Sequence, residues 1–329
     1  MTDPCRTAAL QQTRQALRNE RLQRILEIRT AIQQYLCREL AKAGYVHPPI
    51  YMLAGCTDPL NHCTYPARLD YYGEEISLTQ SLIFQKILMV MLSPVDKVFW
   101  ASPNIRMETR TGGRGYKYTT EFMQVDFEQR AASYAEMLPF ISSLLGGLYA
   151  FLNEHHPATL IQLRGAPLPQ LTVDLPVFDV QDIRERERLA DDDAVERWAA
   201  ARTGGRPFFL VNLRREAYDC FDESSGRFLN YDVVLPPHGR NAHPVECLSG
   251  AERTRSLADL RRRMAELGYP VEYFRPFFDM FTALDAGDGA ISCAGGGFGV
   301  ERLTYAILGL EDIHAVYPIP RPAEGRIAL

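Results

Sequence analysis

Hydrophobic residues at helical spacing predict one long amphipathic helix near the start of the chain, over residues 7–44. Ile25, Ile28 and Ile32 are among its apolar positions, polar residues separate them, and Gly44 ends the pattern. The repeat describes a single helix and not a domain of its own.

A long hairpin is the second strong signal. Two β-type segments, residues 98–108 and 118–128, flank the Gly- and Arg-rich stretch 109–117, which predicts a hairpin with a basic tip. Closely spaced prolines and the charged run 182–197 indicate a variable insertion at about 155–206. Elsewhere the pattern predicts an extended stretch at 45–51, a polar loop at 55–68, helices at 78–92, 134–153, 256–267 and 301–308, and strands at 207–213, 231–235 and 293–299.

Composition indicates a globular protein. With 46% hydrophobic and 23% charged residues, a chain of 329 residues can bury one sizeable core or two small ones. We find neither a run of about 18 uncharged apolar residues nor a signal peptide's apolar stretch, so we expect a cytoplasmic location and no membrane partner. The net charge of -5 argues against a protein that mainly coats nucleic acid. The seven cysteines never form a CxxC spacing, which predicts reduced thiols.

The predicted hairpin carries side chains suited to a nucleotide. Strand periodicity puts Arg106 and Glu108 on one face of the first strand, and Phe122, Gln124 and Asp126 on one face of the return strand. An arginine on a strand suits an α-phosphate, and a phenyl ring suits stacking on adenine. An alternating-charge surface hairpin is the other interpretation, and this segment alone does not choose between the two.

A glycine-rich segment near the C-terminus offers a second surface for a flat ring. Gly295, Gly297 and Gly299 alternate along a predicted strand, and Arg302 follows them. Missing side chains on one strand face would let a ring lie on the backbone, with the arginine covering its other side. A dinucleotide-binding turn is the rival interpretation, but too few residues follow Gly299 for the βαβ unit that it requires.

Three ordered segments together resemble the signatures of class II aminoacyl-tRNA synthetases. Pro49 matches the proline of the first, dimer-forming motif. The segment 106–108, with Glu121 and Phe122 later in the hairpin, matches the second motif, and residues 295–302 match the third. The resemblance implies an α+β fold, an antiparallel sheet flanked by helices.

Within that class the chain is most similar to the aspartyl/asparaginyl branch, and above all to the archaeal asparagine synthetase-related proteins, which are catalytic cores without an anticodon-binding domain. The resemblance implies one catalytic domain over residues 1–329 and a homodimer formed through the segment around Pro48 and Pro49. The similar segments are 57–60, 78–81 with Lys86, 102–106, 121–126, 230–232 and 274–276.

The same resemblance implies an ATP site with Mg²⁺. Arg106 would hold the α-phosphate, Phe122 and Arg302 would sandwich adenine, and Asp232 and Glu246 would hold the metal. This chain spaces the two carboxylates further apart than the family does. Arg106 and Arg302 are the expected catalytic residues, and the expected ATP-binding set is Arg106, Glu108, Arg114, Lys117, Glu121, Phe122, Gly297, Gly299 and Arg302.

For the amino acid, the resemblance implies that Lys86 and Arg253 contact a substrate carboxylate and that Asp126 orients Lys86. Such a pocket would prefer aspartate to a neutral side chain, because two cations facing an amide would be buried without a counter-charge. The methyl group of Ala251, where the family has glycine, narrows the pocket. The expected substrate-binding residues are Ser81, Lys86, Gln124, Asp126, Ser249 and Arg253.

The expected reaction condenses ATP with a carboxylate of aspartate or an analogue, giving an acyl adenylate and pyrophosphate. A nitrogen nucleophile then takes the acyl group, and with ammonia the product is asparagine. The alternative acceptors are a tRNA, a carrier protein or an amine of specialised metabolism. An alternative of another class is a catalytically silent paralogue that binds adenylate-like ligands.

Overall fold

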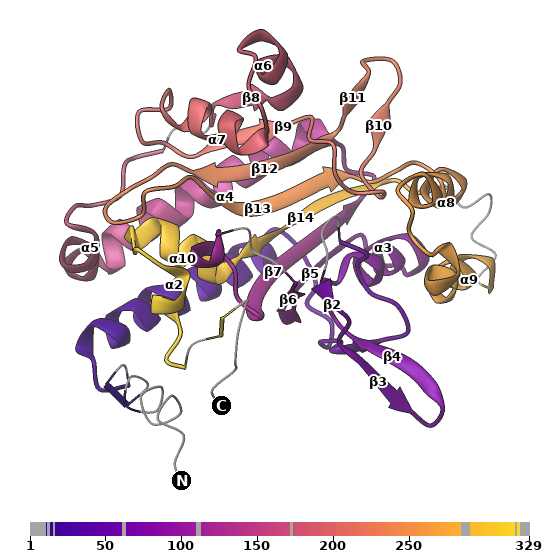
Figure 1. Cartoon of the computed structure of the whole chain (residues 1–329), viewed down its shortest axis with the longest axis horizontal. Helices are drawn as coiled ribbons and strands as arrows, with labels where there is room; N and C mark the ends of the chain where they lie inside the picture. Colours follow the sequence, from indigo (N-terminus) through magenta and orange to yellow (C-terminus); the bar gives the residue numbers. More distant parts are fainter. Residues whose placement is uncertain are drawn as a thin grey trace.

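A seven-stranded sheet forms the centre of the molecule (Figure 1). Neighbouring strands are antiparallel except for the last pair, which confirms the predicted α+β fold with an antiparallel sheet. The computed structural model describes residues 11, 14–15, 17–60, 64–109, 113–171, 174–283, 290–319 and 321–322. In order across the sheet, the strands are β5 (Lys97–Ile105), β7 (Glu121–Arg130), β14 (Cys293–Gly299), β13 (Val245–Glu252), β12 (Asn230–Leu235), β9 (Phe208–Val211) and β8 (Val177–Asp179).

The largest hydrophobic cluster joins the sheet to four helices. Residues of alternate positions on β7, Val125 and Phe127, are fully buried in this cluster. The strand residues between them therefore face the opposite side of the sheet. The helices are α2 (Glu20–Lys42), α4 (Tyr134–His155), α5 (Pro157–Arg164) and α10 (Val300–Leu308).

The other elements surround this body (Figure 1). Helices α3 (Ile83–Leu92), α8 (Leu257–Glu266) and α9 (Arg275–Ala283) share a second hydrophobic cluster with β5. A hairpin of β3 (Arg68–Tyr71) and β4 (Glu74–Leu78) projects away from the sheet. The remaining short elements are β1 (Leu53–Ala54), β2 (Thr64–Tyr65), β6 (Met107–Glu108), β10 (Phe221–Asp222), β11 (Arg227–Phe228) and the 3-10 turns η1 (Gly115–Lys117), η2 (Val271–Phe274) and η3 (Ile313–Val316).

The predicted hairpin and the glycine-rich strand are confirmed. Strands β5 and β7 pair over their whole length, with Ile105 opposite Glu121. Strand β14 has the predicted bounds, and α4 extends the predicted helix 134–153 by two residues, to His155. A capping box starts α4: the amide of Glu136 donates to the hydroxyl of Ser133, whose own amide donates to the Glu136 carboxylate.

Several boundaries differ from the predictions. The predicted helix 7–44 is interrupted: residues 11, 14–15 and 17 are helical, but α2 begins at Glu20, because Asn19 caps it by accepting a hydrogen bond from the amide of Arg21. Residues 7–10 lie outside the described residues. The predicted helix 78–92 begins only at Ile83, since Leu78 still belongs to β4. Strands β2 and β3 begin inside the predicted loop 55–68.

Part of the segment predicted as an insertion at about 155–206 lies on the edge of the sheet. Its strand β8 pairs in parallel with β9, with Val177 opposite Phe209. Its helices α6 (Val180–Arg186) and α7 (Asp192–Ala200) pack on β9 through a third hydrophobic cluster. Residues of α7 thus line the cavity described below.

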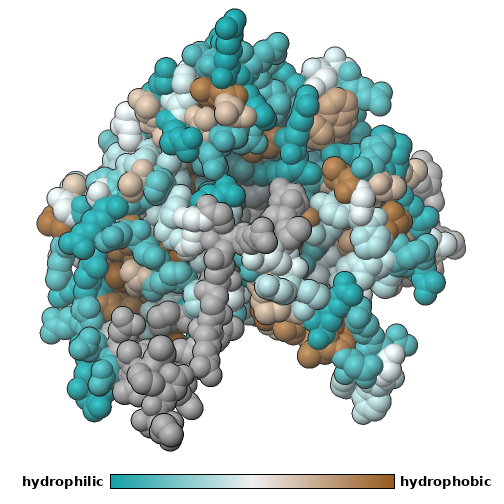
Figure 2. Space-filling model, viewed as in Figure 1, coloured by the Kyte–Doolittle hydropathy of each residue, from teal (hydrophilic) through white to brown (hydrophobic). Residues whose placement is uncertain are grey.

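Helix α4 is, within the described ranges, the one helix long and apolar enough to cross a membrane by length and composition. Its residues Met137, Ile141, Leu145, Leu148 and Leu152 are buried in the main cluster, as in the core helix of a globular protein. The face of the molecule in Figure 2 is mainly hydrophilic, with hydrophobic side chains in smaller patches.

Candidate active site

A cavity of about 400 Å³ lies on the face of the sheet opposite the main cluster. Polar and charged side chains of the central strands line it, together with residues of α3, α7 and the loop between β6 and β7. All but one of the predicted site residues line this cavity: Ser81, Lys86, Arg106, Glu108, Arg114, Lys117, Phe122, Gln124, Asp126, Asp232, Glu246, Ser249, Arg253, Gly297, Gly299 and Arg302.

Glu121 is the exception, since it does not line the cavity, and its contact with ATP stays a prediction. Its side chain is exposed, and Arg321 Nε lies 3.5 Å from Glu121 Oε2. The alternation of a strand explains the difference, because Phe122 faces the cavity and its predecessor must face away. Periodicity along β7 already contained this information.

The glycines of β14 make room for side chains of β7. Gly297 lies opposite Asp126, and a Cβ atom there would lie 2.3 Å from Asp126 Oδ1 and 2.3 Å from Gln124 Nε2. At Gly299 the nearest atom to such a Cβ is Arg302 Cβ, at an ordinary 3.7 Å. The neighbouring polar side chains, and not only a bound ring, therefore require the glycine at 297.

Two buried cations in the cavity are paired with protein carboxylates. Lys86 Nζ lies 3.0 Å from Asp126 Oδ1, as predicted, and 3.6 Å from Glu128 Oε2. Arg253 donates from Nε and Nη2 to the two oxygens of Glu128, both at 2.8 Å. These four side chains are at most 4% exposed.

This pairing corrects the predicted basis of substrate selection. The expected preference for aspartate assumed that Lys86 and Arg253 lack counter-charges, yet each has one in the protein. Glu128 was missed, although it continues the face of Gln124 and Asp126 at the spacing of two residues that a strand requires.

The predicted metal pair, Asp232 and Glu246, also forms ion pairs with arginines. Asp232 accepts a hydrogen bond from Arg215, and Arg302 Nη1 lies 3.1 Å from Glu246 Oε1. Burial, together with the charge of Glu246, raises the pKa of Asp232 to about 6 despite Arg215. Burial alone would raise the pKa of Glu246, but Arg302 and Lys117 bring it below its ordinary value. The two carboxylates therefore act on each other across the cavity.

Asp232 and Glu246 both line the cavity, although this chain spaces them further apart in the sequence than the family does. Strands β12 and β13 pair with Asp232 opposite Ser249 and Val234 opposite Glu246, and the register shifts next to Val234. The added residues 236–244 lie in the connection between the two strands, beyond the paired region. The hairpin thus keeps both carboxylates in the cavity.

The donors present fit a magnesium ion that is shared with a phosphate. Within the described ranges, no group of three or more His, Cys, Asp or Glu side chains could hold a metal by itself. Magnesium usually takes one or two protein carboxylates and completes its octahedron with phosphate oxygens and water. Asp232 and Glu246 suit that role.

Two arginines lie over aromatic rings at the cavity wall. The guanidinium carbon of Arg106 lies 5.1 Å from the centre of the Phe122 ring, and that of Arg302 lies 5.3 Å from the Tyr118 ring. Arg302 Nε also donates to the carbonyl oxygen of Lys117 at 3.3 Å. These contacts fix the positions of Arg106, expected at the α-phosphate, and Arg302, expected at adenine.

The basic loop between β6 and β7 contacts both the predicted insertion at 155–206 and the connection between β12 and β13. Arg114 Nη1 lies 3.1 Å from Asp193 Oδ2 on α7. The ring of Tyr116 stacks on His243, between β12 and β13, with centroids 4.5 Å apart. Sequence reasoning missed these partners because both segments looked like variable insertions.

Helix α7 also brings Glu196 to the cavity. Burial, and to a smaller extent Glu246 and Asp193, raises the pKa of Glu196 to about 7, while Lys117 opposes the rise. Glu196 is therefore easier to protonate than a glutamate in water.

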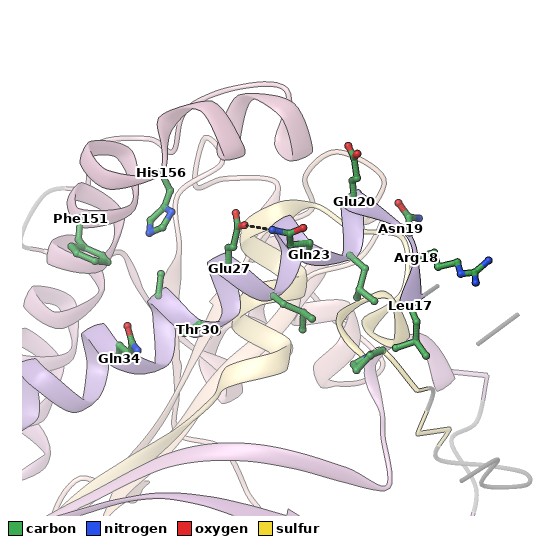
Figure 3. A pocket seen from close by; sticks show the side chains of 14 residues that line it. Leu17, Arg18, Asn19, Glu20, Gln23, Glu27, Thr30, Gln34, Phe151 and His156 are labelled. Carbon is green, nitrogen blue, oxygen red and sulfur yellow. Dashed lines mark hydrogen bonds between the residues drawn. The ribbon is translucent and has the colours of Figure 1, made fainter. Parts of the chain in front are cut away.

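A second cavity, of about 650 Å³, lies along the N-terminal half of α2 (Figure 3). Gln23 and Glu27 of α2 hydrogen-bond to each other beside it, and His156 and Phe151 stand across from them. It contains none of the predicted site residues. The charged cavity on the sheet is therefore the candidate active site.

The antiparallel sheet and its charged cavity match the architecture expected of a class II synthetase catalytic core. The family model of class II tRNA synthetases (D, K and N) matches residues 6–323. The chain belongs to this family.

Curated relatives are about a quarter identical to the chain over the aligned residues. The asparagine-tRNA ligase of Thermoplasma acidophilum is 24% identical over 268 residues, which cover 77% of this chain and 59% of the relative. The aspartate-tRNA(Asp/Asn) ligase of Thermus thermophilus is 24% identical over 274 residues, with the same coverage of 77% and 59%. The chain thus spans about three fifths of the length of these relatives.

Solved structures of the same family share the fold. The asparaginyl-tRNA synthetase of Pyrococcus horikoshii, complexed with asparaginyl-adenylate, superposes with a TM-score of 0.80 at 18% identity, covering 98% of this chain and 73% of that one. The asparaginyl-tRNA synthetase of Entamoeba histolytica gives a TM-score of 0.74 at 18% identity, covering 93% and 69%.

Proposed function

We propose that this protein uses ATP and Mg²⁺ to activate a carboxylate of aspartate as an aminoacyl adenylate, releasing pyrophosphate. One observation carries the proposal: a single cavity on the sheet gathers the expected phosphate, adenine, metal and amino-acid residues. Family membership supports the same chemistry. We keep the single catalytic domain over residues 1–329 as part of the proposal.

Positioning and electrostatics supply most of the catalysis in this proposal. Arg106 neutralises charge on the α-phosphate while the substrate carboxylate attacks it in line, and Arg302 with Phe122 holds adenine. Asp232 and Glu246 would hold magnesium, which would add positive charge at the phosphates. No covalent enzyme intermediate is needed.

For the acceptor, we propose the 3′ end of a tRNA. Curated relatives of this chain are named asparagine-tRNA or aspartate-tRNA ligases, which supports this choice. The ammonia-dependent synthesis of asparagine expected from the sequence has no support from these relatives.

Aspartate remains the proposed substrate because Lys86 and Arg253 line the cavity and have N–H groups that can donate to a ligand. Lys86 has three N–H groups, and Arg253 Nη1 lies 3.9 Å from Asp219 Oδ1, beyond hydrogen-bonding distance. A substrate carboxylate could accept from both. Asparagine is the alternative substrate to test, because the protein carboxylates already balance the two cations.

We also propose a homodimer formed through the segment around Pro48 and Pro49. Val46, Ile50 and Leu53 in this segment are 49%, 46% and 52% exposed, an apolar surface that a second copy would cover. The cytoplasmic location stays an expectation, supported by a relative in Dictyostelium discoideum named a cytoplasmic aspartate-tRNA ligase.

Pyrophosphate exchange into ATP tests the proposal directly. We expect exchange with aspartate, weaker exchange with asparagine, and transfer of labelled aspartate to added tRNA but not to ammonium. Arg106→Ala should reduce exchange at least a thousandfold, whereas Arg262→Ala, on the exposed face of α8, should leave it unchanged. Tight ATP binding without exchange for any amino acid would instead indicate a silent paralogue.

A further inference from the structure

A buried pair of side-chain amides lies beside the active-site cavity, and only one of the two amides has a role so far. Asn104 on β5 is fully buried, and its Nδ2 donates to Gln124 Oε1 on β7 at 2.6 Å. Gln124 lines the cavity and is one of the expected substrate-binding residues, whereas Asn104 is not among the lining residues. Asn104 can therefore affect a ligand only through its partner.

The direction of this hydrogen bond decides which end of the Gln124 amide faces the cavity. With Asn104 as the donor, the buried atom left without a partner among the described residues is an acceptor, Asn104 Oδ1. The reversed pairing would instead deprive the buried Nδ2 of its acceptor. Buried donors without a partner are rarer than under-satisfied carbonyl oxygens, so the pairing in the structure is the favourable one.

Asp126 favours the same orientation from the other side. A Cβ atom placed on Gly297 would lie 2.3 Å from Gln124 Nε2 and 2.3 Å from Asp126 Oδ1, so these two atoms are neighbours. An N–H group next to a carboxylate oxygen is attracted to it, whereas an amide oxygen in that place would be repelled. Both neighbours of the Gln124 amide thus direct its N–H groups away from Asn104.

We infer that Asn104 is a positioning residue, which holds Gln124 with its N–H groups toward the active-site cavity. Gln124 then donates to an acceptor oxygen of the ligand. Along the cavity face of β7, Gln124 lies between Phe122, expected at adenine, and Asp126, which pairs with Lys86. The donor therefore faces the junction of nucleotide and amino acid, and the inference rests on the proposed function for these two ligands.

Calorimetric titration of ATP and of aspartate identifies the oxygen that Gln124 contacts. Gln124→Glu still accepts from Asn104 but presents an oxygen to the cavity, and Asn104→Asp removes the donor, so that Gln124 turns to donate to the new carboxylate. Both variants should weaken the same ligand at least tenfold: aspartate if the acceptor is its carboxylate, ATP if the acceptor is a phosphate oxygen. The control is Ser102→Ala, two residues earlier on the same face of β5, which removes a buried hydroxyl without a partner among the described residues and should change neither affinity twofold.

A double-mutant cycle separates positioning from a general structural role. Asn104→Ala and Gln124→Ala are measured singly and together with the ligand that the first titrations identify. If Asn104 acts through Gln124, the double variant binds no more weakly than Gln124→Ala, whereas independent effects would multiply. Multiplied losses, or full affinity for both ligands in Asn104→Asp and Asn104→Ala, would overturn the inference.

Amide NMR reads the orientation without a ligand or turnover. In the wild type, one side-chain N–H signal of Asn104, identified by its loss in Asn104→Asp, should be shifted downfield by the hydrogen bond. Gln124→Ala should remove this shift, and Gln124→Glu should retain it. An unshifted wild-type signal would overturn the inference. An absence of pyrophosphate exchange would refute the proposed function and leave the orientation of Gln124 to be judged by this spectrum.

Discussion

The ion pair between Arg253 and Glu128 allows a quantitative test of how the cavity is built. Glu128→Gln keeps the shape of the side chain and removes its charge. Two hydrogen bonds of 2.8 Å to Arg253 lose their ionic character, and Lys86 loses a carboxylate oxygen at 3.6 Å. Asp219 then remains beside Arg253, with its Oδ1 3.9 Å from Arg253 Nη1.

The expected cost follows from burial. Glu128 is 0% exposed and Arg253 is 3% exposed, and removing one partner of a buried pair destabilises a protein by about 3–5 kcal/mol. The matched control is Glu266→Gln on α8, whose pair with Arg262 has the same 2.8 Å separation but side chains that are 58% and 57% exposed. A surface pair of this kind contributes about 0–1 kcal/mol.

Urea unfolding followed by circular dichroism measures both variants against the wild type. We expect a large downward shift of the midpoint for Glu128→Gln and almost none for Glu266→Gln. Aspartate titration of the folded variant should also show weaker binding, because Arg253 and Lys86 lose the group that orients them. Equal midpoints for the two variants would refute the view that this buried pair organises the cavity.

Other predictions test single features of the site. Burial raises the pKa of Glu196 from 4.5 to about 7, so its contribution to stability is present below pH 4.5 and is lost as the pH rises through 7; Glu196→Gln should stabilise the protein by about 1–3 kcal/mol at pH 8 but not at pH 4.5 in urea unfolding. Gly297→Ala should weaken aspartate binding at least tenfold in calorimetry by displacing two β7 side chains, while Gly299→Ala, where the new methyl meets Arg302 at 3.7 Å, should change it little. Lys86→Ala should raise the KM for aspartate in pyrophosphate exchange with little change in the KM for ATP, and equal rises in both would contradict its assignment to the amino acid.

Periodicity in the sequence was sufficient for the parts of the site that lie on one element. Spacing of two residues placed Phe122, Gln124 and Asp126 on one face of β7, and alternate glycines defined β14. The same rule would have assigned Glu128 to the cavity and Glu121 away from it. Strand alternation is a property of the local backbone, so it needs no knowledge of the rest of the fold.

Only the tertiary structure decided which charges meet. Arg253 and Glu128 are 125 positions apart, and they pair because β14 lies between β13 and β7 in the sheet. Asp193 reaches the basic loop only because β8 adds to the edge of the sheet and carries α7 with it. A composition of arginines and carboxylates allows many pairings, and the one that forms depends on strand order and register. The sequence by itself therefore determined which side chains share one face of a strand, while the packing of distant segments determined which of them meet in the cavity and which charges are neutralised there.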